Sequence, residues 1–257
     1  MENIINLFLY FVFYAFLGYI CEVIYCSILN KKLTNRGYLY SPICPIYGFG
    51  ALLVIMPLQF FIDNVNYWFS PIIIFILGIL ITSTLEYLTS LIMELVFKMR
   101  WWDYSNRFLN INGRVCLRNS LMFGILVMVV MYLLHPYVTK SVVSLLNDGV
   151  KNVLSIILFA IIFADFILST IKHISFAKLI KKANEAKEKL DLAILQKKEE
   201  FEIKKENAIS FLSSRDFITK LNKFSLKYPT SIIKEFNKKK IIKVYDLYKD
   251  IKEKLGL

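Results

Sequence analysis

Long runs of apolar residues, more than any single motif, limit what this chain can fold into. A helix needs roughly 20 mostly apolar residues to cross the hydrocarbon layer of a bilayer. The sequence contains five such candidates: Ile4–Leu29, Ile43–Ile62, Pro71–Phe97, Val115–Leu134 and Val153–Ile171. In the whole chain 56% of residues are hydrophobic, against roughly 45–50% in soluble domains. We therefore expect an all-α protein, a bundle of about five transmembrane helices.

The second of these runs is the least regular. It is preceded by Pro42 and contains Pro45, Gly48, Gly50 and Pro57, all of which loosen a helix. Irregular backbone at membrane depth occurs where it is buried in protein or lines a water-filled cavity. This span is therefore the candidate for a broken or re-entrant helix beside a polar cavity.

The composition changes abruptly near residue 172. Residues 1–172 are mostly apolar and predict a transmembrane domain, whereas residues 173–257 are rich in Lys, Glu, Asn and Ile and predict a helical tail. Most of the net charge of +12 lies in this tail. Acidic residues interrupt every basic run, which argues against nucleic-acid binding. Basic segments beside a membrane are typical of the cytoplasmic side, where anionic lipids attract them.

The tail shows three amphipathic patterns. The first is a heptad stripe after Ile174, formed by Leu179, Ala183, Ala186, Leu190 and Ala193. A second helix is expected to open at Ser213–Ser214, with an apolar side formed by Phe217, Leu221 and Phe224. A third is expected with Phe236, Ile241, Val244, Tyr245, Tyr248, Ile251 and Leu255 on one side. Each stripe needs a surface to cover it: another tail helix in a bundle, a coiled coil with a second copy, or the membrane.

The distribution of Lys and Arg predicts the orientation. Positive residues follow the first run (Lys31, Lys32) and the third run (Lys98, Arg100), and the tail is strongly basic. The segments before the first run and directly after the second contain no Lys or Arg. Cytoplasmic loops carry the excess of positive charge. We therefore expect a multi-pass protein of the bacterial inner membrane, with the N-terminus outside, as a retained span, and the C-terminus in the cytoplasm.

Ionisable residues interrupt the apolar runs and mark a candidate site. They are costly in lipid, so each is treated first as part of a functional site. The candidates for a polar cavity in the inner half of the membrane are Glu22, Glu86, Glu94, Arg114 and Arg118. By helical rise Glu86 lies about 12 Å deeper than Glu94. Two readings stay open: carboxylate–arginine pairs that only fix helix packing, or a site for a substrate, a proton or a lipid head group.

Two segments on the predicted cytoplasmic side have unusual composition. Residues 35–48 are dense in Gly and Pro, which indicates a fixed turn path and not a flexible linker. Residues 100–105 hold paired Trp residues that suit a membrane interface, and the Asn112-Gly113 step suits a turn. These segments are expected to bind a partner, to gate the cavity, or simply to anchor the helix ends.

A family resemblance rests on these segments. Gly18-Tyr19 with Glu22 is followed by NRGYLYSPICPIYGFG at 35–50, LEYLTSLIMELVFKMRWWDYS at 85–105 and NINGRVCLRNSLMFG at 110–124. Over about residues 10–130 the chain resembles the bacterial ABC-transporter type IV permeases. The resemblance implies a transmembrane subunit that works with a separate ATPase.

The matched positions follow from the same resemblance. In the polar cavity they are Glu22, Glu86, Glu94 and Arg114. The resemblance also points to a partner-contact set: Asn35, Arg36, Gly37, Pro42, Cys44, Pro45, Tyr47, Gly48, Trp102, Asp103, Tyr104, Ser105, Asn112 and Gly113. The basic tail lies outside the resemblance.

Several chemistries have no pattern in the sequence. There is no GxxxxGK[ST] phosphate loop, and no HExxH or CxxC metal pattern. We therefore expect no catalytic residues, no cofactor and no metal, and a chain that is not itself an enzyme. Permease-like transport is the first hypothesis. A lipid head-group binding or modifying protein, and a membrane scaffold or sensor, remain the alternatives.

Overall fold

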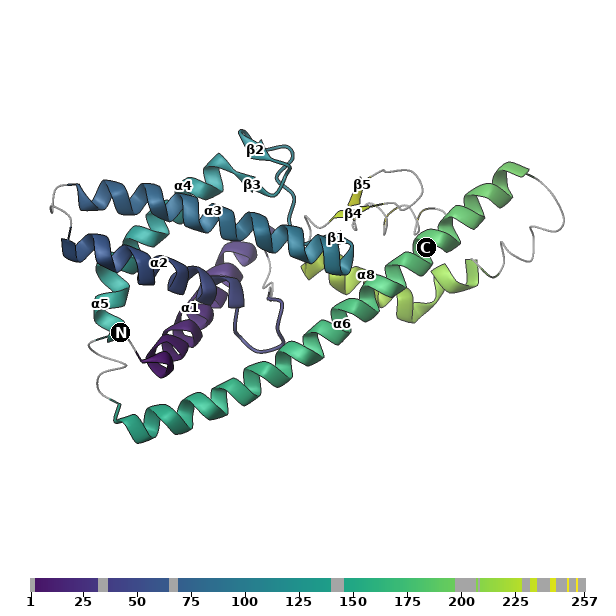
Figure 1. The fold of residues 1–257 in the computed structure, drawn as a ribbon. Coiled ribbons are helices and arrows are strands. Elements are labelled where there is room, and N and C mark those ends of the chain that lie inside the picture. The colour runs from purple at the N-terminus through teal and green to yellow at the C-terminus, as the bar shows by residue number, and fades with distance from the viewer. Residues whose placement is uncertain are drawn as a thin grey trace. The chain divides into compact units, whose positions relative to one another are not determined.

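The structure is a computed structural model that is mostly helical (Figure 1). It describes residues 3–31, 37–64, 69–139, 146–196, 207, 209–227, 232–234, 241–243, 249 and 253. The helices are α1 (Ile4–Asn30), α2 (Pro45–Asn64), α3 (Ser70–Phe97), α4 (Leu117–Val129), the π-helical turn η1 (Val130–Leu134), α5 (His135–Val138), α6 (Asp148–Gln196) and α8 (Arg215–Lys227). The short strands are β1 (Met99–Arg100), β2 (Asn110–Ile111), β3 (Val115–Cys116), β4 (Ile232–Lys234) and β5 (Ile241–Lys243).

Four helical segments within the described ranges are long and apolar enough to cross a membrane. They are Ile4–Ile28, Ser70–Phe97, Leu117–Val138 and Asp148–Lys189. The remaining predicted run, Ile43–Ile62, corresponds to α2, whose apolar part, Pro45–Gln59, is shorter. The prediction of a transmembrane helix bundle is confirmed. The expectation of a break in α2 is wrong, because the helix runs through Pro57 to Asn64.

The outer surfaces of the long helices carry large apolar side chains. Ile76 and Leu80 of α3 are 52% and 57% exposed, and Ile156 of α6 is 70% exposed. In water such continuous apolar surface would favour aggregation, whereas lipid tails cover it at no cost. The burial pattern therefore agrees with helices that face lipid on one side and protein on the other.

Helix α6 is much longer than a bilayer requires. Its 49 residues span about 74 Å at the rise of an α-helix, against roughly 30 Å of hydrocarbon. The apolar N-terminal half is followed, without a break in the helix, by a segment that contains Lys178, Lys181 and Lys182. One continuous helix therefore joins the apolar and the basic parts of the chain.

The chain divides into two compact units. Unit 1 comprises Met1–Leu91 with Tyr104–Ser169, and unit 2 comprises Ile92–Asp103 with Thr170–Leu257. The division falls inside α6, near the predicted boundary at 172/173, but unit 2 also takes in the end of α3. The two predicted domains therefore stay a prediction.

Unit 1 contains a tight crossing of α1 and α2. A Cβ atom at Gly18 of α1 would lie 2.2 Å from Cγ of Tyr47, and one at Gly48 of α2 would lie 2.6 Å from Cδ2 of Phe11. Small residues let helix backbones approach closely in membranes. Buried residues such as Tyr14, which belongs to the same core cluster as α2 and α3 side chains, complete this packing.

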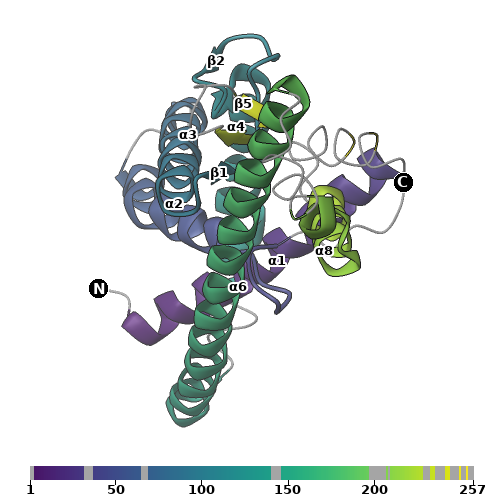
Figure 2. The same ribbon diagram turned by 90° about the vertical axis from the view of Figure 1, so that its right-hand side faces the viewer.

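Unit 2 is held by aromatic packing around α8. The hydroxyl of Ser214 accepts a hydrogen bond from the backbone N–H of Phe217 at 3.4 Å and caps the helix. Phe217 and Leu221 are fully buried. The rings of Phe224 and Phe176 stack with centroids 4.0 Å apart, which brings α8 into contact with α6 (Figure 2). The second predicted tail helix is therefore confirmed, together with the apolar face assigned to it.

The third predicted tail helix is wrong at Ile241–Lys243. This segment is strand β5, which pairs antiparallel with β4, and β4 pairs antiparallel with β1. Each of the paired tail strands reads Ile-Ile-Lys, and β-branched residues favour strands over helices. In the first tail stripe Ala183 is buried and Leu179 is half-buried, while the side chains of Leu190 and Ala193 lie outside the described set.

Candidate functional site

A hairpin joins α3 to α4 in unit 1. Strands β2 and β3 pair antiparallel, with Asn110 opposite Cys116. The turn between them contains Asn112 and Gly113 with φ of 52° and 68°, the left-handed region that these residue types tolerate best. The predicted Asn-Gly turn is thus confirmed. It is closed onto the preceding segment by a hydrogen bond from Tyr104 N to Gly113 O at 2.8 Å.

The Asn110 side chain holds the hairpin together. Its Nδ2 donates to the carbonyls of Ser105 and Arg107 at 3.0 and 2.9 Å, and its Oδ1 accepts from Gly113 N at 3.0 Å. We predict that Asn110→Ala destabilises the hairpin by about 2 kcal/mol, because three hydrogen bonds are lost at once. Hydrogen exchange over residues 104–114 measures this. The matched variant Asn106→Ala, at an exposed position, should change protection little; equal loss in both variants would contradict the assignment.

A second element of unit 1 is the segment between α1 and α2, which is pinned to α6. The carboxylate of Asp165 accepts hydrogen bonds from Tyr40 N at 3.0 Å, Ser41 N at 2.7 Å and Ser169 Oγ at 3.0 Å. Farther along, Cys44 N donates to Ala15 O of α1 at 2.9 Å. The prediction of a fixed path for this Gly- and Pro-rich segment is therefore confirmed for its described part.

The fixed segment leads directly into α2 and places Tyr47 against α1. The Tyr47 hydroxyl donates to Oε2 of Glu22 at 2.8 Å, and Cys26 Sγ lies 3.7 Å from Oε1 of the same carboxylate. Tyr47 fits there only because Gly18 has no side chain. Glu22, one of the predicted cavity residues, is thus held by a phenol from the neighbouring helix.

Glu86 provides the second carboxyl group of the same unit. Its side chain is only 5% exposed. Tyr104 donates a hydrogen bond to it, and the carboxyl lies close enough to Glu22 for an electrostatic interaction. Its Oε2 atom is buried and has no hydrogen-bond partner among the described residues. Glu22, Tyr47, Glu86 and Tyr104 form what we call the carboxyl–phenol cluster.

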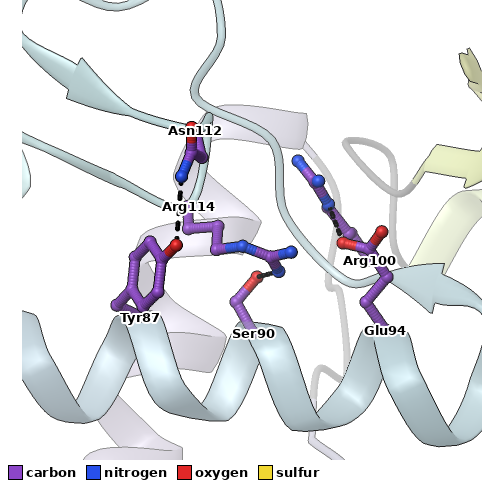
Figure 3. A network of polar contacts seen from close by, with 6 residues as sticks. All are labelled: Tyr87, Ser90, Glu94, Arg100, Asn112 and Arg114. Atoms are coloured by element: carbon purple, nitrogen blue, oxygen red, sulfur yellow. Dashed lines mark hydrogen bonds and ion pairs between the residues drawn. The ribbon is translucent and has the colours of Figure 1, made fainter.

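Arg114 lies on the hairpin side of α3 (Figure 3). Its Nη1 donates to Ser90 Oγ at 3.1 Å, its guanidinium stands 5.5 Å from the centre of the Tyr87 ring, and it is buried. Asn112 Nδ2 donates to the Tyr87 hydroxyl at 3.0 Å. The hairpin thus places the buried guanidinium of Arg114 against Ser90 of α3, one helical turn after Glu86.

Within unit 2, Glu94 pairs with Arg100 (Figure 3). Both side chains are largely buried, and the backbone at Lys98 between them is left-handed, with φ 57°. Lys98 N donates to Glu94 O at 2.8 Å, so the end of α3 folds back tightly. The predicted face of α3 is confirmed, since Glu86, Ser90 and Glu94 are all buried.

The remaining predicted residues are distributed as follows. Asn35 and Arg36 lie outside the described residues. Arg118 is exposed at the start of α4, and we leave it out of the site. Within the predicted partner-contact set, Gly37 and Gly113 are buried, Cys44, Pro45, Trp102 and Asp103 are half-buried, and Pro42, Ser105 and Asn112 are exposed.

Three residues that organise these elements were left out of the predicted site. Asp165 fixes the segment before α2, Asn110 fixes the hairpin, and Arg100 pairs with Glu94. A lone acidic residue inside an apolar run was a signal for Asp165, because such a group needs a partner. No local pattern indicated that its partners are the backbone amides of Tyr40 and Ser41.

These features define the class of protein: a polytopic membrane protein with buried ionisable side chains in its apolar helices. A family model described as "Putative ABC-transporter type IV" matches residues 9–170, and the chain belongs to this family. The matched part includes both motif segments and the carboxyl–phenol cluster. Neither a search of curated proteins nor a search of solved structures found a match.

Proposed function

We propose that the chain is the membrane-spanning permease-like subunit of an ABC-type transporter, working with a separate ATPase subunit. It crosses the membrane of the cell five times, with α2 as one crossing, the N-terminus outside and the C-terminus in the cytoplasm. The positive residues beside the hairpin support this orientation, since Arg107 and Arg118 are both exposed there. The family to which the chain belongs supports the transporter role.

The observation that carries the proposal is the carboxyl–phenol cluster in unit 1. Glu86 is buried within a helix whose outer surface suits lipid, next to a second carboxyl group, Glu22. Holding helices together needs no such pair, because apolar contacts and small residues do so at less cost. The cluster is therefore a substrate site reached from the inner half of the membrane.

The exposed end of the hairpin is the surface that we assign to the ATPase. Phe108 is 79% exposed, and its neighbours Leu109 and Ile111 are also exposed. Unlike the lipid-facing side chains, they project from a hairpin with a defined fold, whose base leads to Arg114 and α3. Exposed aromatic and aliphatic side chains on an ordered element are typical of the core of a protein interface.

A pull-down from the native membrane tests both the role and this surface. The full-length chain is solubilised in detergent, and co-purifying proteins are identified by mass spectrometry. We expect an ATP-hydrolysing subunit with the wild type, and a roughly tenfold lower yield of it with Phe108→Ala, because removal of an aromatic anchor typically costs more than 1 kcal/mol.

Phe69→Ala is the matched control, since Phe69 is also exposed but lies at the other end of α3. It should leave the yield of the ATPase unchanged. Recovery of the chain alone, with only bound lipid, would contradict the transporter role. Recovery of the ATPase at equal yield with Phe108→Ala would contradict the assignment of the hairpin.

A further inference from the structure

The ligand chemistry of the carboxyl–phenol cluster follows from its unused hydrogen-bonding capacity. Glu86 Oε2 is a buried acceptor that no donor reaches among the described residues. Buried polar atoms in native structures nearly always have partners, and an exception needs an explanation. Arg114, the buried cation of the same unit, is engaged with Ser90 and Tyr87 and leaves this oxygen without a donor.

The charges around this oxygen favour a cation. Glu22 interacts electrostatically with Glu86, and two carboxylates in a low-dielectric environment repel each other unless a proton or a cation compensates one charge. A positively charged ligand bound to the pair would provide that compensation and supply the missing donor. An anionic group would add to the repulsion and would bring no donor to Glu86.

The phenols restrict the ligand further. The Tyr47 proton is directed to Glu22 and the Tyr104 proton to Glu86, so the phenol oxygens can only accept further hydrogen bonds. The cluster therefore offers hydrogen-bond acceptors within an apolar helix bundle, which suits a cationic group that carries N–H donors.

We propose that the carboxyl–phenol cluster binds an alkylammonium group, so that the transported substrate is an organic cation with N–H donors. The ammonium group donates to Glu86 Oε2 and is neutralised by Glu22 and Glu86. Its alkyl part is accommodated among the apolar residues of the membrane helices. This inference rests on the proposed function, whose substrate class it names.

Ligand-induced thermal stabilisation of the purified full-length protein tests the inference. Butylammonium, tetramethylammonium and potassium chlorides are titrated at equal ionic strength and fixed pH. Butylammonium carries N–H donors, whereas tetramethylammonium has the same charge and none. We expect butylammonium to stabilise the wild type with an apparent affinity roughly tenfold higher than that of tetramethylammonium. Equal responses to the three salts would overturn the inference.

The variant Glu86→Gln should lose this preference, because the amide has no charge and only one acceptor oxygen. Glu185→Gln is the matched control, since Glu185 is exposed in the basic part of α6, and it should respond as the wild type does. Glu22→Gln serves as a second variant if Glu86→Gln does not fold. If the variant that folds still prefers butylammonium to tetramethylammonium, the inference is overturned. This holds for Glu86→Gln and, in its place, for Glu22→Gln.

The failure of this inference is distinct from failure of the transporter role. Capture of the ATPase together with equal responses to the three salts would overturn only the substrate class. Butylammonium binding that depends on Glu86, without capture of an ATPase, would support the assigned ligand class and contradict the transporter role.

Discussion

Gly18→Ala is expected to destabilise the protein by about 3 kcal/mol, although alanine favours helices more than glycine does. The added Cβ would lie 2.2 Å from Cγ and 2.3 Å from Cβ of Tyr47. The backbone fixes the position of the Tyr47 Cβ atom, so rotation of the side chain cannot relieve the clash and α1 and α2 must separate. Overpacking of this kind costs roughly 1–3 kcal/mol or more, which outweighs the gain of up to about 1 kcal/mol in helix propensity.

The thermal midpoint of the detergent-solubilised chain measures the effect, with an expected fall of roughly 5–10 °C. Gly50→Ala is the matched control on α2, because its Cβ would only reach normal contact, 3.4 Å from Cδ2 of Leu85. It should leave the midpoint unchanged or raise it slightly. A Gly18→Ala variant as stable as the Gly50→Ala variant would contradict the close crossing of α1 and α2.

Asp165→Ala is expected to release the segment before α2 and to destabilise unit 1 by about 3 kcal/mol. The carboxylate accepts hydrogen bonds from the backbone N–H groups of Tyr40 and Ser41, and hydrogen bonds to charged groups contribute roughly 1.5–3 kcal/mol each. A buried charge in an apolar helix is itself destabilising, so the removal of the Asp165 carboxylate offsets part of this loss. The net effect stays strongly unfavourable, because two amide donors lose their acceptor.

Hydrogen exchange at Tyr40 and Ser41, together with the thermal midpoint, measures this effect. Exchange at the two amides should rise sharply in Asp165→Ala. Asp148→Ala on the same helix is the control, since the Asp148 side chain is 91% exposed and its carboxylate lies 3.5 Å from Nζ of Lys151. Surface pairs of this kind contribute at most about 1 kcal/mol. Unchanged protection of Tyr40 and Ser41 in Asp165→Ala would show that the carboxylate does not hold the segment.

The membrane helices of this protein were predictable because each is encoded by one long, continuous run of apolar residues. The face of α3 was also predictable, since Glu86, Ser90 and Glu94 recur every four residues. The α8 helix was predictable from its Ser cap and the spacing of Phe217, Leu221 and Phe224. In each case the signal lies within about 30 residues of sequence.

What could not be predicted depends on contacts between distant segments. Asp165 meets Tyr40 and Ser41 across 125 and 124 residues of sequence, and nothing local specifies backbone partners. The strand at Ile241–Lys243 was missed because its apolar residues also fit a helical repeat, and pairing with β4 decides the outcome. Pro57 suggested a break in α2, but a single missing N–H is tolerated when neighbouring helices pack around it.

ATP hydrolysis by the complex captured through the full-length chain tests the central claim most directly. The wild type, Glu86→Gln and the control Glu185→Gln are captured from the native membrane and compared in lipid nanodiscs. We predict that all three retain the ATPase. The rate of ATP hydrolysis should fall roughly tenfold only in Glu86→Gln, because an intact substrate site is needed to stimulate hydrolysis by the ATPase subunit. Equal hydrolysis in all three complexes, or capture of the chain without any ATPase, would contradict the claim.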